Sequence, residues 1–170
     1  MRFFGPRLVP LAVTIVITQV ALFPQLRILG VVPDLGLVAA VAVAYRLGAE
    51  PGAWFGFAVG LGYDLFLHTP TGLSALAYAL CAYLVGSLER GLLRRGRWLP
   101  SFLGLAGGFV GGSIFLIVGV LAGVTDLGTV RAVSIETRVA LYDALVAPAV
   151  FALVNVVLRD EQPAWRFRDD

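Results

Sequence analysis

The chain has 170 residues, of which 59% are hydrophobic and 14% charged, and its formal net charge is +2. With a mean hydropathy of +0.88, this composition is far too apolar for an ordinary soluble domain. Several apolar runs approach the roughly 20 residues that a helix needs to cross a bilayer. The sequence therefore predicts an all-α integral membrane protein with a single transmembrane domain over residues 1–170, and it excludes a separate soluble domain.

Six apolar segments are expected to cross the membrane as a compact helical bundle, at about residues 8–26, 32–47, 51–67, 73–88, 101–123 and 139–158. The second and third are short and are separated by a tight turn from Leu47 to Pro51, so five spans is the alternative count. The first run follows Arg2 and Arg7 but lacks a small-x-small cleavage site, which favours a span over a cleaved signal peptide. Residues 124–139 carry apolar residues at helical spacing and are expected to form a short surface helix or a polar connector.

Arginine positions predict the orientation of this bundle. All thirteen cationic residues are Arg, and a cytoplasmic N-terminus with six spans places ten inside and three outside: Arg2, Arg7, Arg46, Arg90, Arg94, Arg95, Arg97, Arg159, Arg166 and Arg168 against Arg27, Arg131 and Arg138. Because cytoplasmic loops of membrane proteins are enriched in basic residues, both termini are expected in the cytoplasm. The basic loop is short and adjoins the bilayer, which argues against nucleic-acid binding.

Glycines recur at every fourth residue in two of the predicted spans. The third span carries Gly52, Gly56 and Gly60, and the fifth carries Gly104, Gly108 and Gly112, with a second row at Gly107 and Gly111. Residues four apart share one face of a helix. Small residues stabilise membrane helix pairs because they let two backbones approach closely. These rows predict close helix packing, either within one protomer or against another protein.

Ionisable residues inside the spans gather toward the predicted outer side of the membrane. An Asp at the centre of a span costs about 2.5 to 3.5 kcal/mol on insertion, which nearly cancels the gain from the apolar residues around Asp64. We therefore expect an outer polar cluster of Asp34, Asp64, His68, Arg138 and Asp143, with Arg138 as counter-ion for one carboxylate. Three roles are open for this cluster: helix capping and register, a ligand, ion or proton site, or a docking surface for a periplasmic partner.

Catalytic and metal-binding patterns are weak in this sequence. A single His and scattered carboxylates provide no nucleophile–base set, no HExxH motif and no phosphate-binding loop, so no enzyme activity or cofactor is expected. Asp64 and His68 lie one helical turn apart, but two ligands are too few for a metal site. Cys81 is the only cysteine. It is expected to be a small packing residue, since no intrachain disulfide can form.

Two stretches resemble the rod shape-determining protein MreD family. "VVPDLGLVAAVAVAYRLG" at residues 31–48 is similar to the Pro-Asp start of that family's second helix. "GAWFGFAVGLGYDLFLHTPTGLSALAYALCAYLVG" at residues 52–86 is similar to its glycine-rich helix, membrane Asp, turn ending in Pro-x-Gly-Leu, and small-residue helix. The matching positions are Pro33, Asp34, Asp64, Pro70 and Gly72, of which Pro33, Pro70 and Gly72 belong to turns.

The resemblance implies a non-catalytic, multi-pass subunit of the elongation machinery in the bacterial cytoplasmic membrane. Such a subunit binds the scaffold MreC, and together they couple the MreB cytoskeleton to the peptidoglycan synthases RodA and a class B penicillin-binding protein. The resemblance also implies an architecture like that of the substrate-binding subunits of energy-coupling factor transporters. A small-solute-binding subunit of such a transporter is therefore the alternative function.

Overall fold

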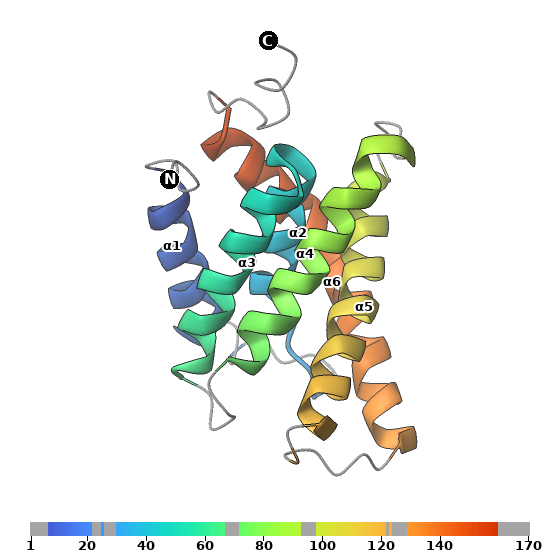
Figure 1. The fold of residues 1–170 in the computed structure, drawn as a ribbon. Coiled ribbons are helices and arrows are strands. Elements are labelled where there is room, and N and C mark those ends of the chain that lie inside the picture. The colour runs from blue at the N-terminus through green and yellow to red at the C-terminus, as the bar shows by residue number, and fades with distance from the viewer. Residues whose placement is uncertain are drawn as a thin grey trace.

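The computed structural model describes residues 7–21, 25, 30–66, 72–92, 98–121, 123 and 129–159. Within these ranges the chain forms six helices and no strand: α1 (Leu8–Ala21), α2 (Leu35–Leu47), α3 (Ala49–Asp64), α4 (Leu73–Leu92), α5 (Leu99–Leu121) and α6 (Thr129–Val157). The six helices run side by side as one bundle (Figure 1). The prediction of an all-α protein is therefore confirmed.

The helix boundaries differ from the predicted segments in one important place. α6 begins at Thr129 and continues without interruption to Val157, so the expectation of a separate surface helix or a polar connector is wrong for residues 129–139. This first part of the helix packs on α5, where the Ser113 hydroxyl donates a 2.8 Å hydrogen bond to Glu136 Oε1. The contact with α5 gives these residues a partner that the sequence alone does not show.

The second and third apolar segments form separate helices. Only Gly48 lies between α2 and α3, and its φ of +105° is strained for any residue with a side chain. Pro51 lies within the first turn of α3, where a backbone N–H has no partner inside the helix and its loss costs little. The turn therefore favours six helices over the alternative count of five.

The central element of the bundle is α2. It contacts all five other helices, and every residue from Leu35 to Ala44 is buried. Before Tyr45 its sequence contains only Leu, Gly, Val and Ala, so it can be surrounded on all sides by other helices. Cys81 of α4 is also buried in this core, where its thiol donates to the Gly107 carbonyl at 3.4 Å.

The glycines of α3 lie where its neighbours come closest. A Cβ built at Gly60 would lie 2.6 Å from both the N and the Cα of Ala75 in α4, and one built at Gly56 would lie 2.8 Å from the Tyr78 carbonyl oxygen. A Cβ at Gly52 would overlap with Ala44 of α2. This row of glycines thus lies against α2 and α4 of the same chain.

The two glycine rows of α5 face different helices. Gly104 and Gly108 lie against α6, where a Cβ at Gly104 would be 2.6 Å from the Cβ of Ala147. Gly107 and Gly111 lie against α2, and a Cβ at Gly111 would be 2.5 Å from a methyl group of Leu37. The offset of three residues between the rows therefore lets α5 pack closely on two neighbours at once.

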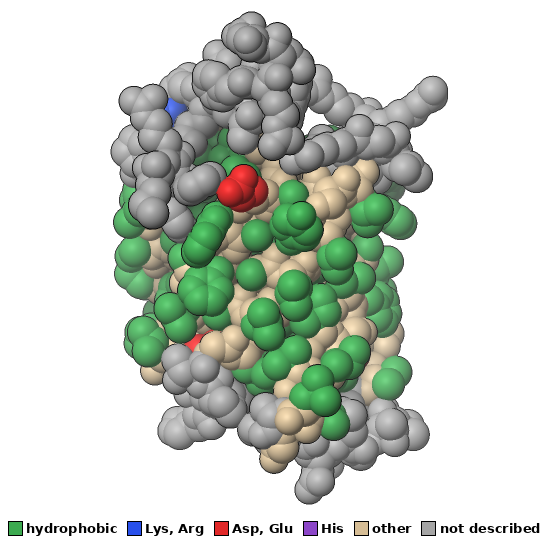
Figure 2. Space-filling view, in the orientation of Figure 1, with side chains coloured by type: hydrophobic (Ala, Val, Ile, Leu, Met, Phe, Trp, Pro, Cys, Tyr) green, Lys and Arg blue, Asp and Glu red, His purple; other side chains and the backbone are tan. Residues whose placement is uncertain are grey.

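The exterior of the bundle is apolar. Large hydrophobic side chains such as Phe57, Leu61, Leu80 and Leu84 are exposed on α3 and α4, and apolar side chains cover most of the described surface in Figure 2. Two helical stretches, Leu99–Leu121 and Val133–Val157, are long and apolar enough to cross a membrane. The other apolar helices are shorter, so the prediction of six membrane crossings remains a proposal.

The start of α1 and the end of α6 lie at the same end of the bundle. A hydrogen bond of 3.5 Å from the Arg7 guanidinium to the Val157 carbonyl joins them. We call the opposite end, at the bottom of Figure 1, the distal end. There α1, α3 and α5 finish and α2, α4 and α6 begin. The N-termini of three helices, whose first N–H groups have no partner within their own helix, therefore lie at the distal end.

Candidate functional site

Asp64 is the last residue of α3, and its side chain caps the N-terminus of α4. Its Oδ2 accepts hydrogen bonds from the N–H groups of Gly72 at 2.8 Å and Ala75 at 3.3 Å, and its Oδ1 accepts one from Ser74 at 3.2 Å. Gly72 has no side chain with which to cap this helix, and its φ of +108° favours glycine. Asp64 therefore supplies, from a neighbouring helix, the acceptor that an N-cap residue ordinarily provides.

The burial of Asp64 depends on the close approach of α3 to α4. Only 2% of the residue is exposed. Gly60 lies one turn earlier on the same face, and its missing side chain lets the backbone of α4 reach α3 at Ser74 and Ala75. Buried backbone N–H groups need hydrogen-bond partners within the protein, and the carboxylate of Asp64 provides them. The carboxylate and the glycine row thus form one packing unit.

The N-terminus of α2 is capped by three polar side chains from three helices or their flanks. Asp34, the N-cap residue, accepts from the Leu37 N–H at 3.0 Å. Gln19 of α1 accepts from the Leu35 N–H at 2.9 Å and donates to the Pro33 carbonyl at 3.1 Å. Gln19 is buried, so it connects α1 to the start of α2 with both ends of its amide satisfied.

Asp143 of α6 provides the third of these contacts. Its Oδ1 accepts a hydrogen bond of 2.6 Å from the Asp34 N–H. Asp143 is completely buried, and its Oδ2 has no hydrogen-bond partner among the described residues. That oxygen lies near Gly108 of α5, 3.0 Å from where a Cβ would stand. The Asp143 carboxyl group therefore binds the backbone of a residue 109 positions away in sequence, at the start of α2.

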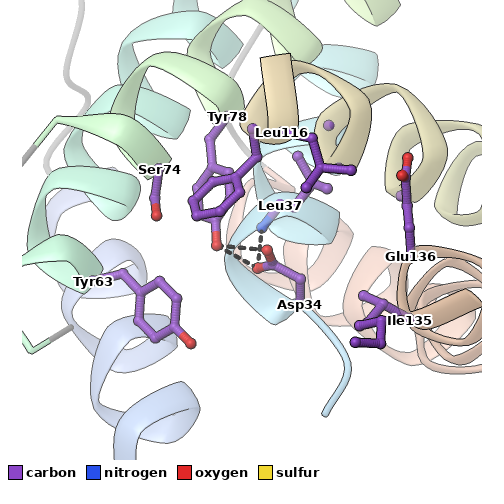
Figure 3. Close-up of a pocket in the computed structure, with 13 residues that line it drawn as sticks. Asp34, Leu37, Tyr63, Ser74, Tyr78, Leu116, Ile135 and Glu136 are labelled. Carbon is purple, nitrogen blue, oxygen red and sulfur yellow. Dashed lines mark hydrogen bonds between the residues drawn. The ribbon is translucent and has the colours of Figure 1, made fainter. Parts of the chain in front are cut away.

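Tyr78 of α4 holds the side chain of Asp34 from the other side. Its hydroxyl lies 2.6 Å from both carboxylate oxygens of Asp34, and the ring is buried. Figure 3 shows the Tyr78 hydroxyl and the Leu37 backbone converging on Asp34. The Asp34 carboxylate thus links α2 to α4, while its backbone links α2 to α6.

The five residues expected in one outer cluster are placed differently from one another. Asp34 and Asp143 are joined directly, whereas the described partners of Asp64 are all backbone groups at the start of α4. Arg138 lies on α6 with an exposed side chain. His68 lies outside the described residues, as does Pro70 of the predicted turn motif. Pro33 is buried beside Asp34, and Gly72 is the residue whose N–H binds Asp64.

A cavity of about 490 Å³ adjoins the Asp34 carboxylate. Residues from α3, α4, α5 and α6 line it together with Asp34 and Leu37 at the start of α2. In Figure 3, Tyr63 and Ser74 lie on one side of this space, Glu136 and Ile135 lie on the other, and Asp34 and Tyr78 lie between them. The cavity is therefore the place where the two helix pairs of the bundle, α3 with α4 and α5 with α6, meet at its distal half.

Sequence reasoning missed three polar residues of this region. Gln19 and Tyr78 lie inside apolar runs, and Glu136 lies in the segment expected to be a surface helix or a polar connector. A buried amide inside an apolar run is costly without a partner. The position of Gln19 in the sequence therefore indicates that its side chain needs hydrogen-bond partners from another part of the chain. Tyr78 and Glu136 carry no comparable local signal, because their partners come from other helices.

The described residues contain no group of three His, Cys, Asp or Glu side chains able to hold a metal ion. The polar side chains at the distal end instead bind backbone N–H groups at the starts of α2 and α4, or bind one another. These hydrogen bonds connect five of the helices to one another, namely α1, α2, α3, α4 and α6. They are a set of interhelical connections beside a cavity.

An all-helical bundle with an apolar exterior and membrane-length helices defines a helical membrane protein. The chain belongs to the rod shape-determining protein MreD family, whose family model matches residues 1–159. This match covers all six helices. No curated protein and no solved structure matches the chain. The resemblance read from residues 31–48 and 52–86 is thereby confirmed, and a role in determining rod shape follows from it.

Proposed function

We propose that this chain is a non-catalytic subunit of the bacterial cell-elongation machinery that binds MreC. In this role it supports peptidoglycan synthesis by RodA and a class B penicillin-binding protein, and it links them indirectly to the MreB cytoskeleton. The observation that carries the proposal is the family match over residues 1–159. A shape-determining membrane protein of this size acts through the proteins that it holds together.

The packing of the bundle supports an assembly role. Asp34 and Asp64 each cap the start of a helix and hold it in a fixed position. Glycines bring α3 and α5 into close contact with their neighbours. Such a bundle presents a rigid set of helix faces to the surrounding membrane. The many exposed apolar side chains provide surface both for lipid and for the membrane helix of a partner.

We further propose that all six helices lie in the bacterial cytoplasmic membrane with both termini in the cytoplasm. The start of α1 and the end of α6 lie at the same end of the bundle. An even number of membrane crossings requires this arrangement. The excess of arginine in the loops on that side supports a cytoplasmic position for it. The distal end, with Asp34, Asp64 and the cavity, then faces the periplasm.

A small-solute-binding subunit of an energy-coupling factor transporter is the second candidate function. The observation that favours it is the cavity of about 490 Å³ at the distal half of the bundle, since transporters of that type bind their solute in an outward pocket. The family match favours the elongation role instead. The two functions predict different consequences when the protein is lost.

Depletion of the protein from rod-shaped cells tests the proposed function. We expect the cells to become round while solute uptake is unchanged, because the synthases that extend the side wall lose their coordination. Re-expression of the chain restores rod shape, and an unrelated membrane protein expressed at the same level does not. Normal rods with a defect in the uptake of one solute would contradict the elongation role and support the transporter.

A further inference from the structure

The cavity has the size of a small-molecule binding site. Its volume is about 490 Å³, and ligand pockets are typically about 300 to 1,000 Å³. Apolar side chains and glycines make up most of its wall, among them Leu37, Phe115, Ile135 and Val139. A wall with so few polar groups could not satisfy the backbone of an extended peptide. It fits a ligand that is mostly hydrocarbon and carries one polar group.

The polar groups that do reach the cavity define the charge of that ligand. Two carboxylates line it, Asp34 from the start of α2 and Glu136 from α6, together with the hydroxyl groups of Tyr63, Ser74 and Tyr78. None of the described residues in the wall is Arg or His. A protonated amine only donates hydrogen bonds, and its charge favours the ionised form of a carboxyl group beside it, whose oxygens then accept them. The wall is therefore complementary to a cation.

A third carboxylate lies directly behind the wall. Asp143 is completely buried, and its Oδ2 has no hydrogen-bond partner among the described residues. That oxygen lies close to Gly108, which itself lines the cavity. A buried acceptor without a donor is costly, by about 1 to 3 kcal/mol. A positive charge in the adjoining space would offset part of this cost, whereas an anion would add to it.

Aromatic rings provide an additional attraction for a cation. Tyr63, Tyr78 and Phe115 all line the cavity, and Figure 3 shows the rings of Tyr63 and Tyr78 on either side of the approach to Asp34. A cation over the face of such a ring is attracted by its π electrons, more strongly where water is excluded. The Asp34 carboxyl group thus lies beside two aromatic rings at the wall of an apolar space.

We infer that this cavity binds an amphiphilic amine, with its hydrocarbon body against α5 and α6 and its protonated amine between Asp34 and Glu136. The inference does not depend on the elongation role. The amine could belong to a free small molecule or to the headgroup of a membrane lipid. Both sources present the same chemistry to the two carboxylates.

Binding of 4-phenylbutylamine to the full-length chain in phosphatidylglycerol nanodiscs tests the inference. We expect saturable binding of one amine per chain by equilibrium dialysis, after subtraction of the uptake by nanodiscs without protein. The isosteric 4-phenylbutanol and the anion 4-phenylbutyrate should bind at least about ten-fold more weakly, since they lack the charged donor. Equal binding of the alcohol and the amine would overturn the inference.

Variants locate the bound amine. Glu136→Gln keeps the shape of a half-buried side chain and should weaken amine binding about ten-fold, whereas Glu50→Gln, an exposed acid on α3, should leave it unchanged. Val139→Phe fills the cavity and should abolish binding, while Val133→Phe on the exposed face of the same helix should not. Thermal unfolding without ligand verifies that each variant folds. Unchanged binding in both cavity variants would place the amine elsewhere and overturn the inference.

The composition of the nanodisc distinguishes the two sources of the amine. If a lipid headgroup is the natural occupant, phosphatidylethanolamine in the disc should compete with 4-phenylbutylamine in the native chain. No competition, with binding still dependent on Glu136, identifies a free amine as the ligand. Both results support the site.

Discussion

Replacing Asp64 with alanine tests whether the buried carboxylate stabilises the fold by capping α4. The side chain accepts hydrogen bonds from three backbone N–H groups, at 2.8, 3.2 and 3.3 Å. Removing it leaves these donors buried without an acceptor, and each such group costs about 1 to 3 kcal/mol. The three losses overlap because they share one acceptor. We therefore expect a loss of about 3 to 5 kcal/mol in the free energy of unfolding.

Two further variants distinguish the loss of the capping hydrogen bonds from the loss of a negative charge. Asp64→Asn keeps the shape and one acceptor oxygen, so it should lose about 1 to 3 kcal/mol, less than alanine. Glu50→Ala removes an exposed acid from the first turn of the same helix and should change stability by less than about 0.5 kcal/mol. The free energies come from unfolding in mixed micelles, followed by tryptophan fluorescence. If Asp64→Ala unfolds like Glu50→Ala, the capping account is refuted.

Two other variants, each with a control, test how α4 is held against α3 and against Asp34. Gly60→Ala should destabilise the bundle by about 1 to 3 kcal/mol, because its Cβ would lie 2.6 Å from the backbone of α4. In the control Gly62→Ala the new Cβ meets only a side-chain methyl group, at 3.1 Å, so this variant should lose less stability. Equal unfolding free energies for the two variants would contradict close backbone packing. Tyr78→Phe removes the hydroxyl that holds Asp34 and should cost about 1 to 3 kcal/mol. Tyr83→Phe changes an exposed ring on the same helix and should leave the free energy of unfolding unchanged. An unchanged free energy of unfolding in Tyr78→Phe would show that the hydroxyl does not stabilise the site.

The helices of this protein could be predicted from its sequence because they coincide with apolar runs that turn or polar residues separate. Gly48 and Pro51 also mark the turn between α2 and α3, since each has a backbone property that a helix interior excludes. The start of α6 could not be predicted in this way. Its first residues are stabilised by packing on α5 and by the hydrogen bond from Ser113 to Glu136, which are contacts between distant parts of the chain.

The partners of the embedded acids show a similar division. The cost of a carboxylate in an apolar span indicated that Asp64 and Asp34 needed protein partners. Which partners they have depends on how the helices are arranged. The carboxylate of Asp64 reaches N–H groups 8 to 11 residues further along the chain, whereas the N–H of Asp34 binds a side chain 109 residues away. The hydropathy pattern contains no information about the second kind of contact.

Isolation of the tagged chain from a mildly solubilised membrane is the most direct test of the proposed function. The elongation role predicts that MreC is recovered with it in a constant ratio, along with RodA and the class B penicillin-binding protein in smaller amounts. A variant that destabilises the bundle, such as Asp64→Ala, should reduce this recovery, whereas Glu50→Ala should retain it. Recovery of a paired ATPase module without MreC would contradict the account.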